Sequence, residues 1–281
     1  MDYLSLDPLL RDALREDIGR GDITSEALRQ SFPGSREDEA FAAVMAREPL
    51  VVAGWPVFFR VFELLGAVEI ISPPREGNHV ASGEIGRLKG DPFLLLKGER
   101  VALNLFQKTC GIATQTARVV SLVSHTGVGI LDTRKTTPLW RDLEKYAVRV
   151  GGGMNHRWRL DDAILIKDNH IEIAGGVAAA VTACRKGAPH LARVEVEVST
   201  SDQLEEAIEA GAEVVMLDNM SPAQVRQAVG RAAGRCRLEV SGGVTEENVV
   251  EYAESGVEFI SMGALTHSVS ASDISVVLST V

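Results

Sequence analysis

Six short apolar runs in the second half of the chain constrain its fold more than any other feature. Each run is followed by a helical pattern, and successive runs begin about 20 to 35 residues apart. The runs cover residues 128–131, 163–166, 194–198, 214–217, 238–240 and 259–262. Strands that alternate with helices in this way predict a parallel sheet. Polar residues follow every run, so we expect them to meet at the carboxyl edge of that sheet.

The same pattern separates an α/β barrel from a doubly wound sheet. No GxGxxG motif opens the first strand–helix unit, and polar residues end every strand instead of gathering at one switch point. Both features favour the barrel. Six units are fewer than the eight of a complete barrel, so the barrel must be incomplete or closed by other segments.

The first half of the chain has a different order of elements. A helix is predicted from Asp7-Pro8 to about Asp17, with the proline at the first helical position. Strand-like runs then alternate with one amphipathic helix around residues 57–65, and a further helix is predicted to begin near Glu99. This order indicates an α+β layer of its own.

Composition excludes several classes of protein. The 281 residues carry a net charge of −10, which argues against non-specific binding to nucleic acid. Three widely spaced cysteines form no CxxC pair, so neither a disulfide framework nor a zinc site is expected. The start of the chain has no signal-type apolar core, and residues 49–71 are too interrupted by charge to span a bilayer. We therefore expect a cytoplasmic protein that does not bind membranes.

Two glycine-rich turns are candidates for phosphate binding. Ser241-Gly242-Gly243 and Gly263-Ala264 follow the last two runs, where barrels commonly hold phosphate on backbone N–H groups. Glycine allows a positive φ and a close approach of the anion. Either turn alone could be structural, but the occurrence of both favours a phosphate site.

Carboxylates end the two runs before these turns. Glu197 and Asp218 should both project into the mouth of the barrel, where they could bind Mg²⁺ or sugar hydroxyls. Glu195 lies on the same face as Glu197, and one of the two could be a structural residue of the barrel interior. Glu197 is nearer the strand end and is the better candidate.

Cationic residues gather after the first two runs. Arg134 and Lys135 follow the first run, Lys167 follows the second, and His156-Arg157 lie between them. Guanidinium groups suit bidentate recognition of carboxylates, and ammonium groups suit phosphates. Together these side chains predict a pocket for a small molecule with several negative charges.

The segments that carry these residues resemble those of the quinolinate phosphoribosyltransferases, the decarboxylating enzymes also called nicotinate-nucleotide pyrophosphorylases. The resemblance covers nearly the whole chain and departs from the family pattern where Leu139-Trp140 replace the usual glycine after Pro138. The matching segments are residues 16–24, 99–104, 131–138, 144–149, 151–157, 165–170, 194–198, 216–220, 241–243 and 261–267.

The resemblance implies a fold and a reaction. The expected fold class is α/β, with an N-terminal α/β sandwich (residues 1–115), an incomplete TIM-like α/β barrel (116–268), and a C-terminal segment (269–281) that returns to the first domain. The expected enzyme is a pentosyltransferase of NAD biosynthesis. It converts quinolinate and phosphoribosyl pyrophosphate into nicotinate mononucleotide, CO₂ and pyrophosphate with Mg²⁺, as a homodimer or a dimer-based higher oligomer.

The resemblance also implies roles for single residues. Those expected to bind quinolinate are Arg100, Arg134, His156, Arg157 and Lys167. Those expected to hold the ribose and pyrophosphate are Lys135, Glu197 and Asp218, the two acids also holding Mg²⁺ directly or through substrate or water. Those expected to form the 5′-phosphate site are Ser241, Gly242, Gly243 and Gly263. Arg100 is expected to reach the active site of the neighbouring subunit from a turn.

Two alternatives remain open at this point. A paralogous group associated with molybdate-transport operons has the same fold, although its members depart from the Thr-Arg-Lys-Thr-Thr-Pro and Lys-Asp-Asn-His patterns, which are intact here. A barrel aldolase that uses Lys167 as a Schiff base is the alternative from a different class.

Overall fold

The computed structural model describes residues 2–31 and 39–280 and divides the chain into two compact units. The first unit consists of Met1–Gln115, Asp142–Gly151 and Val269–Val281, and the second of Thr116–Arg141 and Gly152–Ser268. The chain therefore passes between the units more than once. The segment Asp142–Gly151, which the sequence placed inside the barrel domain, lies in the first unit.

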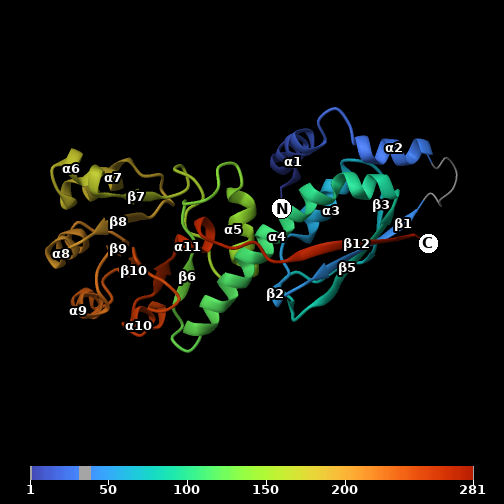
Figure 1. The fold of residues 1–281 in the computed structure, drawn as a ribbon. Helices are drawn as coiled ribbons and strands as arrows, with labels where there is room; N and C mark the ends of the chain where they lie inside the picture. The colour runs from blue at the N-terminus through green and yellow to red at the C-terminus, as the bar shows by residue number, and fades with distance from the viewer. Residues whose placement is uncertain (1, 32–38, 281) are drawn as a thin grey trace. The chain divides into compact units, whose positions relative to one another are not determined.

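An antiparallel sheet forms the centre of the first unit (Figure 1). Its four strands lie in the order β12 (Ile274–Thr280), β1 (Ala40–Ala46), β5 (Gly83–Gly90) and β3 (Val68–Ser72). A smaller sheet pairs β2 (Leu50–Val51) with β4 (His79–Val80). The helices of this unit are α1 (Tyr3–Ile18), α2 (Ile23–Ser31), α3 (Trp55–Glu63), the first part of α4 (Pro92–Val123) and α5 (Arg141–Val150). Because β12 pairs with β1 along its whole length, the C-terminal end of the chain completes this sheet.

Aromatic side chains from α3 and α4 form the core of the first unit. The Phe58 ring lies 5.1 Å from Trp55, 5.3 Å from Phe62 and 5.2 Å from Phe106, measured between ring centroids. The Glu76 carboxylate accepts hydrogen bonds from the first backbone N–H groups of α3, at Gly54 and Trp55. It thereby caps the helix that delivers most of this aromatic cluster.

Two helices begin earlier than the sequence predicted. The first begins at Tyr3, where the Asp2 side chain accepts a hydrogen bond from Leu4 N–H, and it contains Pro8 in its interior. The placement of Pro8 at the first helical position was wrong, because the aspartate cap outweighs the backbone bond that the proline cannot make. The second, α4, begins at Pro92 instead of near Glu99.

The start of α4 changes the setting of Arg100. The Asp91 carboxylate caps the helix by accepting from the N–H groups of Phe93 and Leu94. Arg100 consequently lies within a continuous helix and is exposed there. The expectation that it follows a turn was wrong.

A parallel sheet of six strands forms the second unit and confirms the predicted barrel architecture. The spatial order is β6 (Gly129–Leu131), β11 (Phe259–Ser261), β10 (Arg237–Ser241), β9 (Val214–Asp218), β8 (Val194–Val198) and β7 (Ile164–Ile166). The connecting helices are α6 (Asp168–Ala174), α7 (Val177–Gly187), α8 (Ser201–Glu209), α9 (Pro222–Ala232), α10 (Val249–Ala253) and α11 (Ala264–His267). Every run predicted as a strand is one.

Two helices of this unit begin at capping residues that can be recognised in the sequence. Ser221 caps α9 in a reciprocal capping box with Gln224, and Pro222 occupies the first turn. Thr200 caps α8 by accepting from Gln203 N–H at 3.2 Å. Such capping residues mark the start of a helix in the sequence, without knowledge of the tertiary structure.

An irregular segment, residues 154–157, spans the gap between the two edge strands. Met154 bridges Leu131 of β6, and its N–H donates to the Ile130 carbonyl at 2.8 Å. At the other end, the Arg157 guanidinium donates to the Ala163 carbonyl, directly before β7, at 2.8 Å. A sheet with only six strands is thus connected across its opening by the segment that carries His156 and Arg157.

Candidate active site

A buried aspartate positions His156 and its neighbours. Asp132 directly follows β6 and is fully buried. One of its carboxylate oxygens accepts from His156 N–H at 3.0 Å, and the other accepts from the Asn155 side chain. The sequence marked Asp132 as one of several polar residues after a strand, but not as the residue that fixes this segment.

Arg134 and Arg157 bring two guanidinium groups to the same region. Burial, and then the positive charge of Arg134, lowers the pKa of Arg157. Within the described part of the chain, the Nε atoms of both arginines are buried and have no hydrogen-bond partner. An unpaired buried donor costs about 1–3 kcal/mol, more when it is charged. A carboxylate that accepts from both groups would offset this cost, which is the property expected of an anion site.

Lys167 and Glu197 form an ion pair between neighbouring strand ends. Lys167 Nζ donates to Glu197 Oε2, and Ile166 of β7 pairs with Val196 of β8 just before them. The lysine side chain is 46 % exposed and the glutamate side chain 16 % exposed. The motif residue His170 instead accepts from Lys167 N–H and caps α6.

The acid at the end of β9 lies level with the glycine-rich turn after β10. Asp218 pairs in register with Ser241, and Asn219 N–H donates to the Ser241 carbonyl at 3.0 Å. Gly242 and Gly243 have φ values of 87° and 65°, which favour glycine. The predicted carboxylate and the predicted phosphate turn are therefore adjacent.

Lys135 lies beside the second glycine turn. Thr266 Oγ1 donates to the Lys135 carbonyl at 2.8 Å. A Cβ atom at Gly263 would lie 3.1 Å from Lys135 Cδ and 3.0 Å from His267 Nε2. Gly263 thus lets a lysine and a histidine pass close to the backbone, and His267 is a candidate that the sequence argument did not single out.

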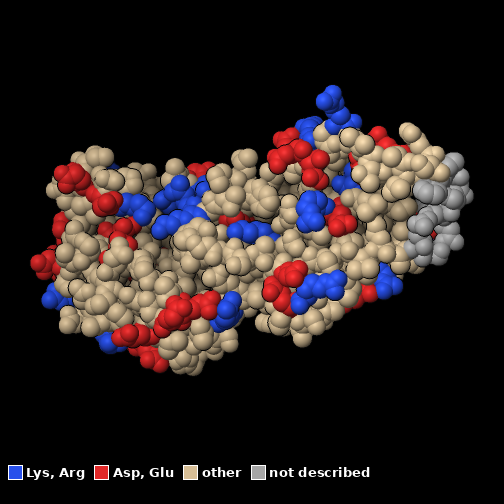
Figure 2. Space-filling view, viewed as in Figure 1, with Lys and Arg blue, Asp and Glu red and all other residues tan. Residues whose placement is uncertain are grey.

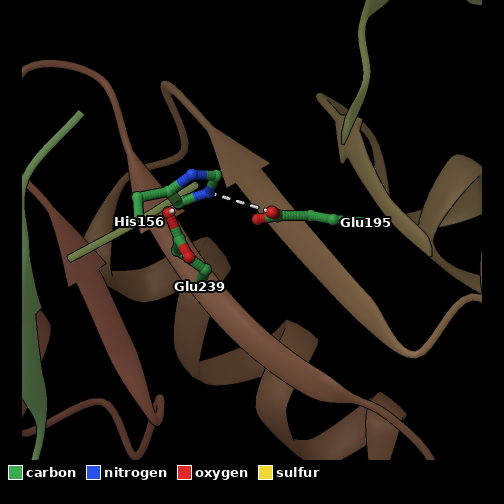
Figure 3. Close-up of side chains that lie close together, drawn as sticks. All are labelled: His156, Glu195 and Glu239. Carbon is green, nitrogen blue, oxygen red and sulfur yellow. Dashed lines mark hydrogen bonds and ion pairs between the residues drawn. The ribbon is translucent and has the colours of Figure 1, made fainter. Parts of the chain in front are cut away.

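His156, Glu195 and Glu239 form a buried cluster inside the sheet (Figure 3). His156 Nε2 lies 2.9 Å from Glu195 Oε2 and 3.8 Å from Glu239 Oε1. The other ring nitrogen, Nδ1, accepts from Arg157 N–H at 2.8 Å. An acceptor at Nδ1 carries no hydrogen, so the hydrogen of a neutral ring lies on Nε2 and points to Glu195. Both ring nitrogens are therefore committed within the protein.

Glu239 is the most buried acid of this cluster. Burial, and then the negative charge of Glu195, raises the pKa of Glu239 to about 8. Two adjacent buried carboxylates cannot both carry a charge without a large cost, so the geometry favours a proton on Glu239. The sequence placed Glu239 in the apolar run at residues 238–240 and did not single it out.

The same cluster could be considered as a metal site. Among the described residues, its three ligand atoms lie within 4.8 Å of one another, as a metal would require. A histidine that binds a metal through Nε2 must offer a lone pair there and carry its hydrogen on Nδ1. The hydrogen bond from Arg157 N–H to Nδ1 imposes the opposite arrangement, so this cluster does not fit a metal.

Cationic side chains are also visible on the surface of the second unit. Figure 2 shows Lys and Arg side chains gathered on the second unit, over the loops beside β7. Arg100 is the one predicted site residue that lies in the first unit, and the other site residues belong to the second. No described helix has the length and apolar character needed to cross a membrane.

Comparison with known proteins gives consistent matches over the whole chain. Residues 22–110 match the family model for the N-terminal domain of quinolinate phosphoribosyl transferase, and residues 112–277 match that for its C-terminal domain. The chain is 44% identical over 277 residues to the probable nicotinate-nucleotide pyrophosphorylase (carboxylating) of Bacillus subtilis, a match that covers 98% of this chain and 94% of the relative. It is 36% identical to the human nicotinate-nucleotide pyrophosphorylase (carboxylating), over 89% of each chain.

The fold is also that of solved structures. The crystal structure of NadC from Streptococcus pyogenes has a TM-score of 0.94 and 40% identity, covering 100% of this chain and 99% of the other. A human nicotinic acid phosphoribosyltransferase structure, 14% identical with a TM-score of 0.64, shares the fold alone. Family models matched in both halves, full-length relatives and a common fold agree with the anion site described above: this chain belongs to the quinolinate phosphoribosyl transferase family.

Proposed function

We propose that this chain transfers the phosphoribosyl group of phosphoribosyl pyrophosphate to quinolinate with loss of CO₂, giving nicotinate mononucleotide and pyrophosphate for NAD biosynthesis. Family membership supports this activity, and the observation that carries it in the structure is the pair of buried, unpartnered Nε donors of Arg134 and Arg157. Quinolinate carries two adjacent carboxylates, which match two converging guanidinium groups.

Arg134, Arg157 and Lys167 bind the quinolinate carboxylates in this proposal. Lys167 supplies a point charge at the end of β7, and the two arginines supply directional donors. Because both ring nitrogens of His156 are engaged by Glu195 and by Arg157 N–H, His156 contributes by holding Arg157 in place.

The opposite side of the site binds phosphoribosyl pyrophosphate. The N–H groups of the turn Ser241-Gly242-Gly243, with Gly263, hold the 5′-phosphate, and Lys135 lies beside them. Glu197 and Asp218 accept hydrogen bonds from the ribose hydroxyls. Their carboxylate oxygens also fit Mg²⁺, which prefers oxygen ligands and, when bound with the substrate, neutralises charge on the leaving pyrophosphate.

The chain's own groups then act mainly through charge. The quinolinate nitrogen forms a bond to the anomeric carbon as the bond from that carbon to pyrophosphate breaks. The carboxylates of Glu197 and Asp218 stabilise the positive charge that develops on the ribose. In the pyridinium product the bond to the 2-carboxylate breaks, CO₂ leaves, and the electron pair remaining on the ring carbon takes a proton from water.

We also propose a homodimer in the cytoplasm, with Arg100 contributed to the partner subunit's site. Mixing two inactive variants, Arg100→Ala and Lys135→Ala, tests this arrangement. Under subunit exchange, each heterodimer would contain one site with both lesions and one with neither, so about half of the activity per mixed dimer should return. Verified heterodimers without activity would assign Arg100 to its own subunit's site.

One assay tests the reaction against its alternatives. Quinolinate, followed by its ultraviolet absorbance, should disappear only when phosphoribosyl pyrophosphate and Mg²⁺ are present. No loss of quinolinate would contradict the proposal and leave the molybdate-operon paralogues as the nearest alternative. Trapping by borohydride with a carbonyl substrate would indicate the aldolase, since phosphoribosyl transfer forms no Schiff base.

A further inference from the structure

Asn219 occupies an unusual position between two parts of the proposed site. It directly follows Asp218 at the end of β9, and its φ of 53° lies in the left-handed region. Asparagine tolerates this conformation better than most residues, but glycine adopts it at no steric cost. The backbone alone therefore does not explain why an asparagine is used here.

The side chain of Asn219 contacts both neighbours of the site. Its Nδ2 donates to Asp218 Oδ2 at 2.7 Å, so one carboxylate oxygen of Asp218 is held in a fixed direction. The amide also occupies the space beside Gly242, where a Cβ atom would lie 2.7 Å from Asn219 Cγ. Asn219 N–H completes the connection by donating to the Ser241 carbonyl.

We infer that Asn219 is a positioning residue, which holds the Asp218 carboxylate and the turn at residues 241–243 as one rigid unit for phosphoribosyl pyrophosphate. This inference rests on the proposed function, since it assigns Asp218 to the ribose and the turn to the 5′-phosphate. These two groups belong to the same substrate molecule, so a fixed separation between their binding sites favours the productive pose. In the proposed function, quinolinate contacts neither group.

The variant Asn219→Gly tests the role of the side-chain amide apart from that of the backbone conformation. Glycine keeps the left-handed conformation, so the variant should fold, but it removes the hydrogen bond to Asp218. Ala233→Gly is the matched control, because Ala233 also has a positive φ, at 46°, and lies exposed directly after α9. It provides the same backbone change without the loss of an amide.

We expect Asn219→Gly to weaken the binding of phosphoribosyl pyrophosphate with Mg²⁺ by about tenfold or more in calorimetry. The Kd for quinolinate and the midpoint of thermal unfolding should match those of the Ala233→Gly control. An unchanged Kd for phosphoribosyl pyrophosphate, or an equal loss of affinity for both substrates, would overturn the inference.

A double variant tests whether the effect passes through Asp218. If it does, Asp218→Asn/Asn219→Gly should bind phosphoribosyl pyrophosphate within about twofold of Asp218→Asn alone. If the double variant instead shows the product of the two single affinity losses, Asn219 does not act through Asp218. The wild-type chain is assayed beside these variants. If the wild type consumes both substrates and Asn219→Gly binds them equally well, the inference alone is rejected. If the wild type does not consume both substrates, the proposed function is rejected as well.

Discussion

Two clusters of buried side chains, one in each unit, differ in their chemistry. The first unit packs Trp55, Phe58, Phe62 and Phe106 against one another, and the Phe58 and Phe106 side chains are fully buried. The interior of the second unit's sheet instead holds Glu195, Glu239 and His156. An aromatic core stabilises a fold through the area it removes from water. Buried carboxylates do the opposite unless they are paired or protonated.

This difference separates residues that maintain the fold from residues that prepare a site. In the second unit the outward-facing residues of β8, Val196 and Val198, pack beneath the helices, while Glu195 and Glu197 face inward. The strand thus serves both purposes through its alternating faces. The two clusters should therefore respond to substitution as differently as their chemistry requires.

Phe106→Ala should have the largest effect on stability. It removes a fully buried ring from the first unit's aromatic core, and such truncations cost about 3–5 kcal/mol. Urea unfolding followed by circular dichroism measures the loss. Quinolinate affinity, measured in the folded fraction, should stay unchanged, and a specific loss of affinity would mean that this core is not separate from the site.

Glu239→Gln should stabilise the protein, in contrast to Phe106→Ala. Burial, and then the charge of Glu195, raises the pKa of Glu239 above its value in an unfolded chain, so the folded state holds a proton that the unfolded state releases. The wild type therefore loses stability as the pH rises from about 5 to 8, by at most about 1.4 kcal/mol per pH unit. Glutamine mimics the protonated acid, so the advantage of the variant should grow over this range.

Denaturant unfolding at several pH values checks the Glu239 prediction. Substitution of the exposed Glu209 by glutamine, in α8, serves as the control. A constant difference between Glu239→Gln and the wild type from pH 5 to pH 8 would show that Glu239 carries no extra proton in the folded state.

Arg134→Ala and Arg157→Ala should weaken quinolinate binding by about 1.5–3 kcal/mol each, the range for a hydrogen bond to a charged group. Arg134→Ala should not lower stability, since it removes a buried Nε donor that lacks an acceptor. Arg157→Ala should lower it slightly, because it also removes the hydrogen bond to the Ala163 carbonyl. Calorimetry with quinolinate measures the effect, and Arg226→Ala on α9 is the control. Unchanged affinity in both variants would mean that the carboxylates bind elsewhere.

Leu139→Gly should have the smallest effect, a gain of about 0.5–1 kcal/mol. Leu139 has a φ of 69° and is 85% exposed, so it pays a backbone cost without burying its side chain. The control Leu160→Gly removes a similarly exposed leucine that lacks a positive φ, and it should lower stability. Unfolding midpoints that move in the same direction for both variants would contradict this account.

Local signals predicted much of this molecule from its sequence. The Ser221 capping box, the alternation of Glu195 and Glu197, and the proximity of Asp218 to the turn at Ser241 follow from periodicity and parallel pairing. The ion pair of Lys167 with Glu197 was not predicted, and it forms because β7 and β8 are neighbours.

The missed features depend on contacts between distant segments. The ring of His156 meets Glu195 and Glu239 from three separate parts of the chain, and a glutamate inside an apolar run was the only signal for Glu239. The start of α4 was missed because the Asp91 cap precedes a run of leucines that also suits a strand. The start of α1 was predicted too late because proline is commonest in the first turn of a helix.

The most direct test of the account uses quinolinate labelled in its 2-carboxylate. If the charged interior of the second unit serves phosphoribosyl transfer, labelled CO₂ and pyrophosphate should appear in equal amounts, and only when quinolinate, phosphoribosyl pyrophosphate and Mg²⁺ are all present. Labelled CO₂ formed without phosphoribosyl pyrophosphate, or pyrophosphate released without CO₂, would contradict the account.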